Sequence, residues 1–219
     1  MMLLETFPVG SFQCNCSVLA CADTKEAMVI DPGGEHLRIL EIVRHYDLTV
    51  KWIVHTHAHL DHIYETRDVK EGAGGTIALH KDDLFLYDGF AMQAAMFGWR
   101  VRPTVPVEHW LTDGETLTFG KRAAEVIHTP GHTPGSCCFK VEGAAGTGTG
   151  TGGLLFAGDT LFQRSIGRTD LPGGDYPTIE RSIREKIYTL DPDTSVIPGH
   201  GPRTTVGDEA RHNPFVQGV

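Results

Sequence analysis

The sequence predicts a mixed α/β fold, and three observations lead to this prediction. Short apolar runs with strand character, such as Ala27–Ile30 and Leu154–Ala157, lead into loops that contain Gly or Pro. A segment at Thr178–Leu190 places Ile179, Ile183 and Ile187 four residues apart, which is a helical spacing. The chain has 219 residues, 40% of them hydrophobic, so it can form one sizeable core. We therefore expect a single domain over residues 1–219.

The expected elements follow from runs of β-branched or apolar residues for strands and from longer periodic stretches for helices. In the first half we expect strands at Leu3–Phe7, Ser17–Ala20, Ala27–Ile30, Trp52–Val54 and Thr76–Leu79, with helices at Glu35–Tyr46 and Lys81–Gly98. In the second half we expect strands at Thr116–Phe119, Ala123–Ile127, Ser136–Val141, Leu154–Ala157 and Ser195–Ile197, with a helix at Thr178–Leu190. Residues 143–153 are rich in Gly and Thr, which predicts a flexible hairpin tip.

One segment after the strand at Trp52–Val54 indicates a metal site. Residues His57–His62 read His-Ala-His-Leu-Asp-His, so three imidazoles and a carboxylate stand within six residues. Neutral imidazole is the commonest metal ligand among side chains, and carboxylate adds a hard oxygen donor. Crowding these groups together gains little unless a cation offsets their desolvation. A solvated histidine-rich turn is the alternative for this segment taken alone.

Three later residues occupy equivalent positions, each in a loop just past a predicted strand: His132, Asp159 and His200. In layered α/β folds functional sites gather at the carboxyl ends of strands, where loops vary on a rigid sheet. Four strand ends thus supply candidate ligands to one region. Together with the residues of the His57–His62 segment they predict a binuclear metal site.

These motifs resemble the metallo-β-lactamase superfamily. The pattern His57-x-His59-x-Asp61-His62 is its hallmark, and His132, Asp159 and His200 match its later ligand positions in order. The resemblance covers nearly the whole chain, from the turn at Asp31 to Pro214. The resemblance implies a four-layer αββα sandwich with the metals at one edge. It also implies which side chains serve as ligands: His57, His59 and His132 for one metal, Asp61, His62 and His200 for the second, and Asp159 between the two.

Two nearby polar residues are candidates for supporting roles. Asp31 stands in a Pro-Gly-Gly turn after a strand and could support a ligand histidine, although turn formation accounts for it equally well. His55 offers a competing register for the histidine motif, but only a start at His57 places Asp and His four and five residues later. We therefore expect His55 in the core or behind the ligands.

The charge and the termini restrict the partners. The formal net charge is −9 without a Lys/Arg cluster, which argues against a nuclease, because nucleic-acid affinity depends on neutralising phosphates. No apolar run approaches the roughly 20 residues of a membrane span. The segment Met1–Glu5 has no basic or long apolar region typical of a signal peptide. We expect a cytoplasmic protein with a small-molecule substrate and no nucleic-acid or membrane partner; the sequence carries no signal of oligomeric state.

The five cysteines fit that placement. An odd number without a regular framework favours reduced thiols. Cys14 and Cys16 alternate along a strand-like segment, so they should share one face and pack in the core. Cys137 and Cys138 are adjacent and should point to opposite faces.

Two bridged metal ions would support hydrolysis. A bound cation can lower the pKa of water from 15.7 to about 7, which supplies hydroxide at neutral pH. In the related enzymes this hydroxide bridges the metals and attacks a carbonyl, so Asp61 and Asp159 are the candidate catalytic residues. Zinc is the first choice for both divalent ions, and iron or manganese also tolerate mixed His and carboxylate ligands.

The substrate is indicated by the loop after Asp159. The stretches Gly158–Phe162 and Ile166–Asp175 are similar to glyoxalase II, the hydroxyacylglutathione hydrolases, and most resemble its short bacterial type II form. This similarity implies cleavage of S-acylglutathione, such as S-lactoylglutathione, to a hydroxy acid and glutathione. Arg168 stands where the family places a basic residue that contacts the glycine carboxylate, and Arg can grip a carboxylate with two hydrogen bonds. A surface arginine in a loop is the alternative.

Two departures weaken the glutathione assignment relative to the metal site. The long glyoxalase II proteins carry a C-terminal helical domain with further glutathione contacts, and this chain ends nineteen residues after His200. Thr169 replaces the aromatic residue that follows the basic one in those proteins.

Asp159 stands where zinc β-lactamases typically carry a Cys or another ligand set, which disfavours antibiotic hydrolysis.

Two other functions remain open. Glutathione persulfide dioxygenases share the Gly167–Asp170 motif and use one iron, here held by His57, His132 and Asp159, with open positions for oxygen and substrate. The setting of His200 in Pro-Gly-His-Gly is typical of binuclear hydrolases instead. A metal-binding protein without catalytic activity is the third possibility.

Overall fold

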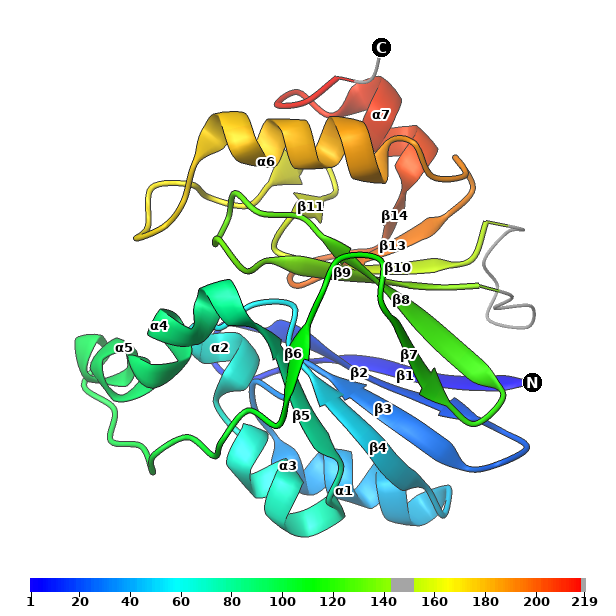
Figure 1. Ribbon diagram of the computed structural model, residues 1–219, viewed down its shortest axis with the longest axis vertical. Helices are drawn as coiled ribbons and strands as arrows, with labels where there is room; N and C mark the ends of the chain where they lie inside the picture. Colours follow the sequence, from blue (N-terminus) through cyan, green and yellow to red (C-terminus); the bar gives the residue numbers. More distant parts are fainter. Residues whose placement is uncertain (143–151, 218–219) are drawn as a thin grey trace.

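Two six-stranded β-sheets lie face to face in the part of the chain that the computed structural model describes, residues 1–142 and 152–217 (Figure 1). The strands of the first sheet are, in spatial order, β1 (Met2–Val9), β2 (Cys14–Cys21), β3 (Glu26–Ile30), β4 (Thr49–Val54), β5 (Thr76–His80) and β6 (His109–Leu111). Those of the second are β14 (Thr204–Thr205), β13 (Ser195–Pro198), β10 (Leu154–Gly158), β9 (Cys137–Val141), β8 (Arg122–His128) and β7 (Thr116–Phe119). A short hairpin pairs β11 (Leu161–Phe162) with β12 (Ser165–Ile166).

Helices cover the outer faces of both sheets, so the layers run helix, sheet, sheet, helix (Figure 1). Under the first sheet lie α1 (His36–His45) and α3 (Thr66–Ala73), and over the second lie α6 (Tyr176–Ser182), its π-helical extension η2 (Ile183–Ile187) and α7 (Val206–His212). At one end stand α2 (Leu60–Ile63), η1 (Lys81–Asp83), α4 (Leu84–Asp88) and α5 (Phe90–Met96). This arrangement confirms the αββα fold class.

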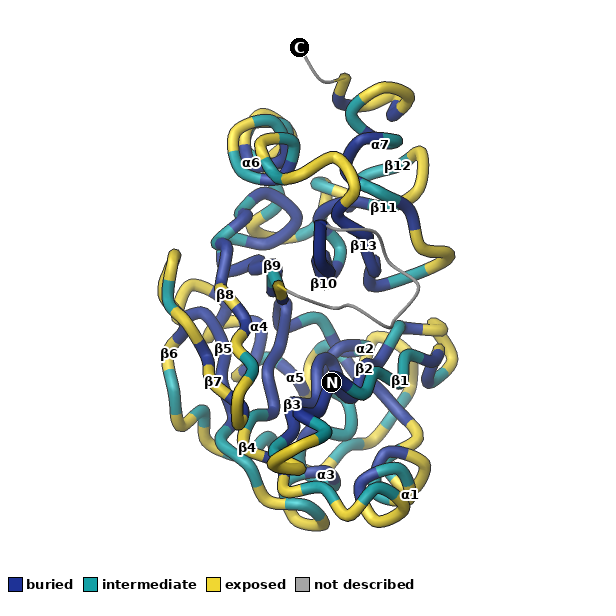
Figure 2. The backbone as a smooth tube through the Cα atoms, turned by 90° about the vertical axis from the view of Figure 1, so that its right-hand side faces the viewer, coloured by how far each residue is buried: buried dark blue, intermediate teal, exposed yellow. Residues whose placement is uncertain are grey.

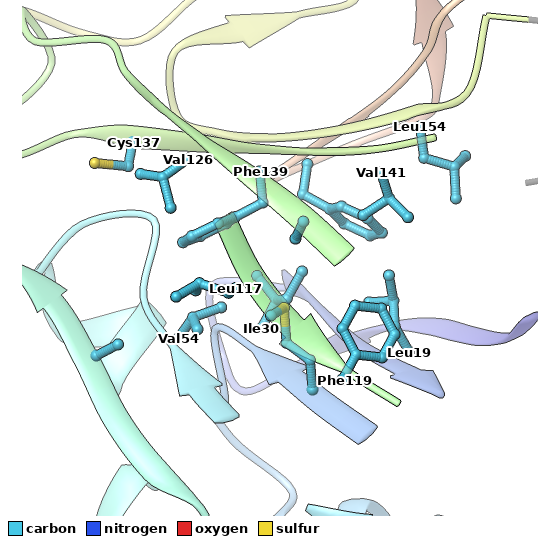
Figure 3. Close-up of a cluster of buried hydrophobic side chains, with 14 of the residues drawn as sticks. Leu19, Ile30, Val54, Leu117, Phe119, Val126, Cys137, Phe139, Val141 and Leu154 are labelled. Atoms are coloured by element: carbon cyan, nitrogen blue, oxygen red, sulfur yellow. The ribbon is translucent and has the colours of Figure 1, made fainter. Parts of the chain in front are cut away.

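The alternation of side chains along each strand builds the layers. On β3, Met28 and Ile30 belong to the core between the sheets, whereas Val29 belongs to the core beneath α1. Figure 3 shows the inter-sheet core, with Ile30 on one sheet and Phe139 on the other. In Figure 2 the strands at the centre are mostly coloured as buried, and the helices carry exposed residues on their outer sides.

The cysteines lie where strand alternation predicts. All five are free and buried. Cys14 and Cys16 share the core beneath α1, whereas Cys137 faces the inter-sheet core and its neighbour Cys138 faces α6. Both predictions about these pairs are confirmed.

The helices differ from expectation in two places. The expected helix at Lys81–Gly98 is divided into η1, α4 and α5, with a break at Gly89, where the backbone turns to ψ 5°. Glycine has a weak helical propensity, so tertiary packing decides whether a helix passes through it. The helix expected at Thr178–Leu190 begins at Tyr176 and changes to a π-helix from Ile183. Its three isoleucines are fully buried, as their spacing predicts.

Two further expectations concern the rest of the chain. The hairpin tip expected at 143–153 lies largely outside the described residues, but the strands that flank it, β9 and β10, pair antiparallel with Leu154 opposite Val141. Among the described residues, no helix combines the length and apolar character that crossing a membrane requires.

Candidate metal centre

The seven candidate ligands follow the ends of four strands. β4 leads into the His57–His62 segment, and β8 leads into the loop that carries His132. β10 and β13 are parallel neighbours, so Asp159 and His200, which follow them, reach the same edge of the second sheet. The two sheets therefore contribute ligands from both sides of their interface, and the structure brings all seven side chains together.

Three ring nitrogens form one cluster. The Nε2 atoms of His57 and His132 lie 3.2 Å apart, and the Nδ1 atom of His59 lies 3.1 Å from the first and 2.9 Å from the second. The other nitrogen of His57 faces Thr56 Oγ1 at 3.1 Å, and that hydroxyl donates to Asp31. The hydroxyl can therefore only accept from His57, which places the proton of His57 on Nδ1.

The same reasoning fixes the proton of His132. Its Nδ1 donates to the backbone carbonyl of Arg168 over 2.7 Å, which leaves a lone pair on Nε2. Lone pairs from His57 and His132 thus point at each other across 3.2 Å, an arrangement that is repulsive unless a cation lies among them. Three convergent imidazoles are a typical ligand set for zinc.

A second cluster contains two imidazoles and one carboxylate, those of His62, His200 and Asp61. His200 Nε2 lies 3.1 Å from Asp61 Oδ2, and His62 Nε2 lies 3.8 Å from the same oxygen. His62 donates from Nδ1 to Asp31 over 3.0 Å, and His200 donates from Nδ1 to the Phe12 carbonyl over 3.0 Å. Each ring therefore directs its Nε2 atom at the cluster.

Asp159 lies between the two clusters and faces each with a different oxygen. Its Oδ2 is 3.6 Å from His132 Nε2 in the first cluster. Its Oδ1 is 3.4 Å from His62 Nε2 and 3.7 Å from His200 Nε2 in the second. This is the arrangement that a bridging carboxylate requires.

Unpartnered atoms test whether these residues fit metal ions. Among the described residues, His62 Nε2 and Asp159 Oδ1 are buried without any hydrogen-bond partner. Buried polar atoms are nearly always paired, so two facing atoms of this kind indicate a partner such as an ion. The donor set fits two divalent cations.

The ionisation of the first cluster and of Asp159 agrees with cation binding. Burial, followed by the neighbouring imidazoles, lowers the pKa of His59 to about 3 and holds the pKa of His57 well below its usual range. Both rings are therefore neutral at pH 7, the form that binds metals. Burial raises the pKa of Asp159, but His62 and His132 outweigh it and hold that carboxyl ionised.

Asp31 supports ligands in both clusters, as the sequence suggested. It is 2% exposed and accepts from the Thr56 amide, from the Thr56 hydroxyl at 2.7 Å and from His62 Nδ1. One carboxylate thus orients His62 directly and His57 through Thr56. His55 is fully buried beside Thr66 and stays outside both clusters.

A second buried carboxylate, Asp83, was missed by sequence reasoning. It lies in η1 and accepts from the Ala58 amide at 3.0 Å, from Thr133 Oγ1 at 2.8 Å and from the Gly135 amide at 2.7 Å. It therefore joins the loop of His57 and His59 to the loop of His132. The segment Lys81–Asp83 matches no motif that would have indicated this role from the sequence.

Glycine at 199 allows the close approach on which the second cluster depends. A Cβ there would lie 2.1 Å from Asp159 Oδ1 and 2.8 Å from the His62 ring. A side chain would displace Asp159 or His62, so the Pro-Gly-His-Gly segment has a physical reason to carry glycine at that position.

The family model for the metallo-beta-lactamase superfamily matches residues 9–200. The chain belongs to the metallo-β-lactamase superfamily. This confirms the family predicted from the sequence, whose members bind metal ions and act as hydrolases. It also agrees with the donor clusters that the fold brings together.

Relatives within the metallo-β-lactamase superfamily include a glyoxalase II-like protein. The chain is 40% identical to the hydroxyacylglutathione hydrolase GloC of Haemophilus influenzae, with 98% of each chain covered. It is also similar to the solved structure of the BLEG-1 B3 metallo-β-lactamase, with a TM-score of 0.87, 38% identity and coverage of 98% and 99%.

Two further solved structures bear on the metal content of relatives. The protein TTHA1623, solved in a di-iron-bound form, has a TM-score of 0.82 at 35% identity, with 97% of this chain and 100% of that one covered. ETHE1 from Myxococcus xanthus has a TM-score of 0.78 at 25% identity, with 97% and 83% covered.

Arg168 takes part in this metallo-β-lactamase site chiefly through its backbone, which accepts from His132. Its side chain is 61% exposed and forms two hydrogen bonds of 2.7 Å to Asp170. A substrate carboxylate would therefore have to compete with Asp170 for the guanidinium. Substrate binding by Arg168 stays a prediction.

Proposed function

We propose that this chain is a binuclear metal-dependent hydrolase that cleaves S-acylglutathione or a related thioester to an acid and a thiol. The observation that carries the proposal is Asp159, whose two oxygens face two separate clusters of nitrogen donors. An enzyme that binds one metal ion would not need the second cluster of donors, which consists of Asp61, His62 and His200.

The ligand assignment follows the two clusters. We assign one metal to His57, His59 and His132, and the second to Asp61, His62 and His200, with Asp159 shared. When bound, the two ions would activate water near pH 7 and polarise the scissile carbonyl. Zinc suits the three-imidazole set, and the di-iron form of TTHA1623 supports iron as the alternative.

The chain's own residues hold this arrangement in place. Asp31, the Arg168 carbonyl and the Phe12 carbonyl each accept a hydrogen bond from Nδ1 of a candidate ligand histidine. The Nε2 atoms of these histidines therefore remain available to bind metal. The carboxyl of Asp159 is ionised, so it is ready to take its place between the two ions and could accept a hydrogen bond from the attacking water. This preorganisation means that little rearrangement accompanies the reaction.

The thioester assignment rests on similarity to the Haemophilus influenzae hydrolase over nearly the whole of both chains. The similarity to BLEG-1 makes a β-lactam the necessary comparison substrate. A glutathione persulfide dioxygenase is the second candidate, because His57, His132 and Asp159 would form its iron site and ETHE1 is a structural relative.

The test combines metal analysis with substrate assays on the purified protein. We expect about two metal ions per chain and cleavage of S-lactoylglutathione. Asp159→Ala should abolish cleavage and reduce the bound metal while circular dichroism shows an intact fold. Asp88→Asn, an exposed carboxyl on α4 outside both clusters, is the matched control and should retain both properties.

Two results would contradict the proposal. One iron per chain with oxygen consumption on addition of glutathione persulfide would identify the dioxygenase. Metal binding without turnover of any thioester, β-lactam or persulfide would indicate a non-catalytic protein.

A further inference from the structure

A pocket adjoins the Asp61 side of the donor clusters. It has a volume of about 290 Å³ and lies between the β1–β2 loop, the turn after β3, and the segments that follow α2 and α5. Asp61 forms part of its lining, so the pocket adjoins the proposed second metal position through that residue. An empty cavity of roughly 150 Å³ holds a benzene molecule, so this space exceeds the needs of a lactoyl group.

One side of the pocket is an aromatic wall formed by Phe12, Tyr64 and Trp99. The Trp99 ring lies 5.8 Å from that of Phe12 and 5.5 Å from that of Tyr64, measured between centroids. Phe97 packs behind the wall, 5.0 Å from Phe12 at an angle of 71°. These are favourable edge-on and tilted contacts, which hold the rings in place while leaving Phe12 40% exposed.

The charge of the pocket is negative. Its lining contains Glu35, Asp61 and Glu65 and, among the described residues, neither Lys nor Arg. Glu65 lies 2.9 Å from His36 Nδ1, and Glu35 pairs with Arg38 at 3.4 Å. An anionic group entering this space would meet Glu35 and Glu65, and the described residues of the lining supply neither Lys nor Arg to pair with it.

The two arms of a glutathione thioester differ in charge and in apolar character, the two properties by which this pocket would select a ligand. The glutathione arm carries two carboxylates and one ammonium group, so it is poorly suited to a negative pocket. The opposite side of the centre, where the Arg168 carbonyl holds His132, offers the guanidinium of Arg168. The acyl arm can be uncharged and apolar, which suits the aromatic wall.

We propose that the pocket of Phe12, Tyr64 and Trp99 binds the acyl arm and selects uncharged groups of the size of an aryl ring. Acyl groups that end in a carboxylate are excluded by Glu35. This inference rests on the proposed thioesterase function, because it assigns one half of that substrate. It places acyl selectivity at the Asp61 side and thiol recognition at the Arg168 side.

Binding tests the pocket independently of turnover. S-phenacylglutathione and S-acetonylglutathione are thioethers that cannot be hydrolysed and differ only in phenyl against methyl. Calorimetric titration of the metal-loaded protein should show the phenyl compound binding about tenfold tighter, a factor that one good aromatic contact supplies. Trp99→Ala and Phe12→Ala should bring the ratio close to one, whereas Trp110→Ala, an exposed tryptophan on β6, should leave it unchanged.

Kinetics tests the charge selection. S-phenylacetylglutathione should have a higher kcat/KM than S-lactoylglutathione, and S-succinylglutathione a lower one. Glu35→Gln should raise the ratio of kcat/KM for the succinyl substrate to that for the phenylacetyl substrate by severalfold.

The outcomes separate the two proposals. Equal binding of the two thioethers, or a phenyl preference that survives in Trp99→Ala and Phe12→Ala, would overturn the acyl pocket while thioester cleavage still supports the function. A phenyl preference lost in both variants, without cleavage of any thioester, would overturn the function and leave an aryl-binding pocket.

Discussion

At the scale of single residues, the centre is defined by the groups that accept a hydrogen bond from Nδ1 of four of the candidate ligand histidines. His57, His62, His132 and His200 donate from Nδ1 to a hydroxyl, a carboxylate and two backbone carbonyls. Apart from Thr56, which precedes His57 in the sequence, these partners come from distant parts of the chain. The ligands themselves could be predicted from spacing, because histidines and carboxylates rarely follow four strand ends in one chain unless they bind a cation.

Their supports could not be predicted as readily. Asp31 was a candidate because it stands in a turn after a strand that precedes the first ligands. Asp83 has no such signal, because its partners Ala58, Thr133 and Gly135 become neighbours only in the folded protein. Hydrogen bonds between loops depend on tertiary geometry, which local spacing does not encode.

Asp83→Asn tests the role of that carboxylate. The amide replaces one acceptor with a donor that faces backbone N–H groups, so the two ligand loops should separate. We expect metal affinity of the His57, His59 and His132 set to fall by about 10–100-fold, as for other residues that orient ligands.

Competition with a chromophoric chelator measures this affinity. Asp82→Asn is the matched control, because Asp82 is the exposed neighbour and makes no contact with either loop among the described residues. Equal metal affinity in wild type and Asp83→Asn would show that the loops are held without this carboxylate.

At the scale of elements, the strands were predicted well and the helices less so. Continuous apolar runs identify β3 and β10 because both of their faces are buried, whereas β8 shows partial alternation of buried and exposed residues. The break at Gly89 and the π-helical turn after Ser182 depend on packing against neighbouring elements. The short β6, β11 and β14 strands have too few residues to show a period.

The start of α6 gives a prediction at this scale. Asp175 caps the helix by accepting from the Thr178 amide at 2.9 Å, and Pro177 occupies its first turn. Asp175→Ala should lower the free energy of unfolding by about 0.5–2 kcal/mol, as for other N-caps.

Urea denaturation measures this change. Asp175→Asn is the control, since asparagine caps a helix about as well and should stay near wild type. A loss in the asparagine variant as large as that in alanine would show that the negative charge, rather than the cap, is what matters.

At the scale of the whole molecule, the metal centre lies across the junction of two sheets. Convergent lone pairs and the buried Asp159 oppose this junction unless cations bind, so bound metal should add to stability. We expect a chelator to lower the Tm of the wild-type protein by several degrees. Differential scanning calorimetry measures the change, and a wild-type Tm that is insensitive to chelation would contradict the prediction.

The same comparison on Asp159→Ala provides the control. This variant lacks the carboxylate between the clusters, so chelation should shift its Tm less than that of the wild type. The fold class was predictable at this scale only through the ligand motif, because strand and helix patterns alone indicate a mixed α/β protein and not the stacking of its layers.

The position of His200 has a consequence for how the enzyme acquires its metals. One cluster joins residues near 60 with a residue 138 positions later. A nascent chain therefore exposes most of its donors on the ribosome long before the last donor is synthesised. The second metal site can close only after β13 has docked beside β10. We therefore expect metal uptake at the proposed second site to require completed folding, and a chain stalled before residue 200 to lack one of the proposed ligands of that site.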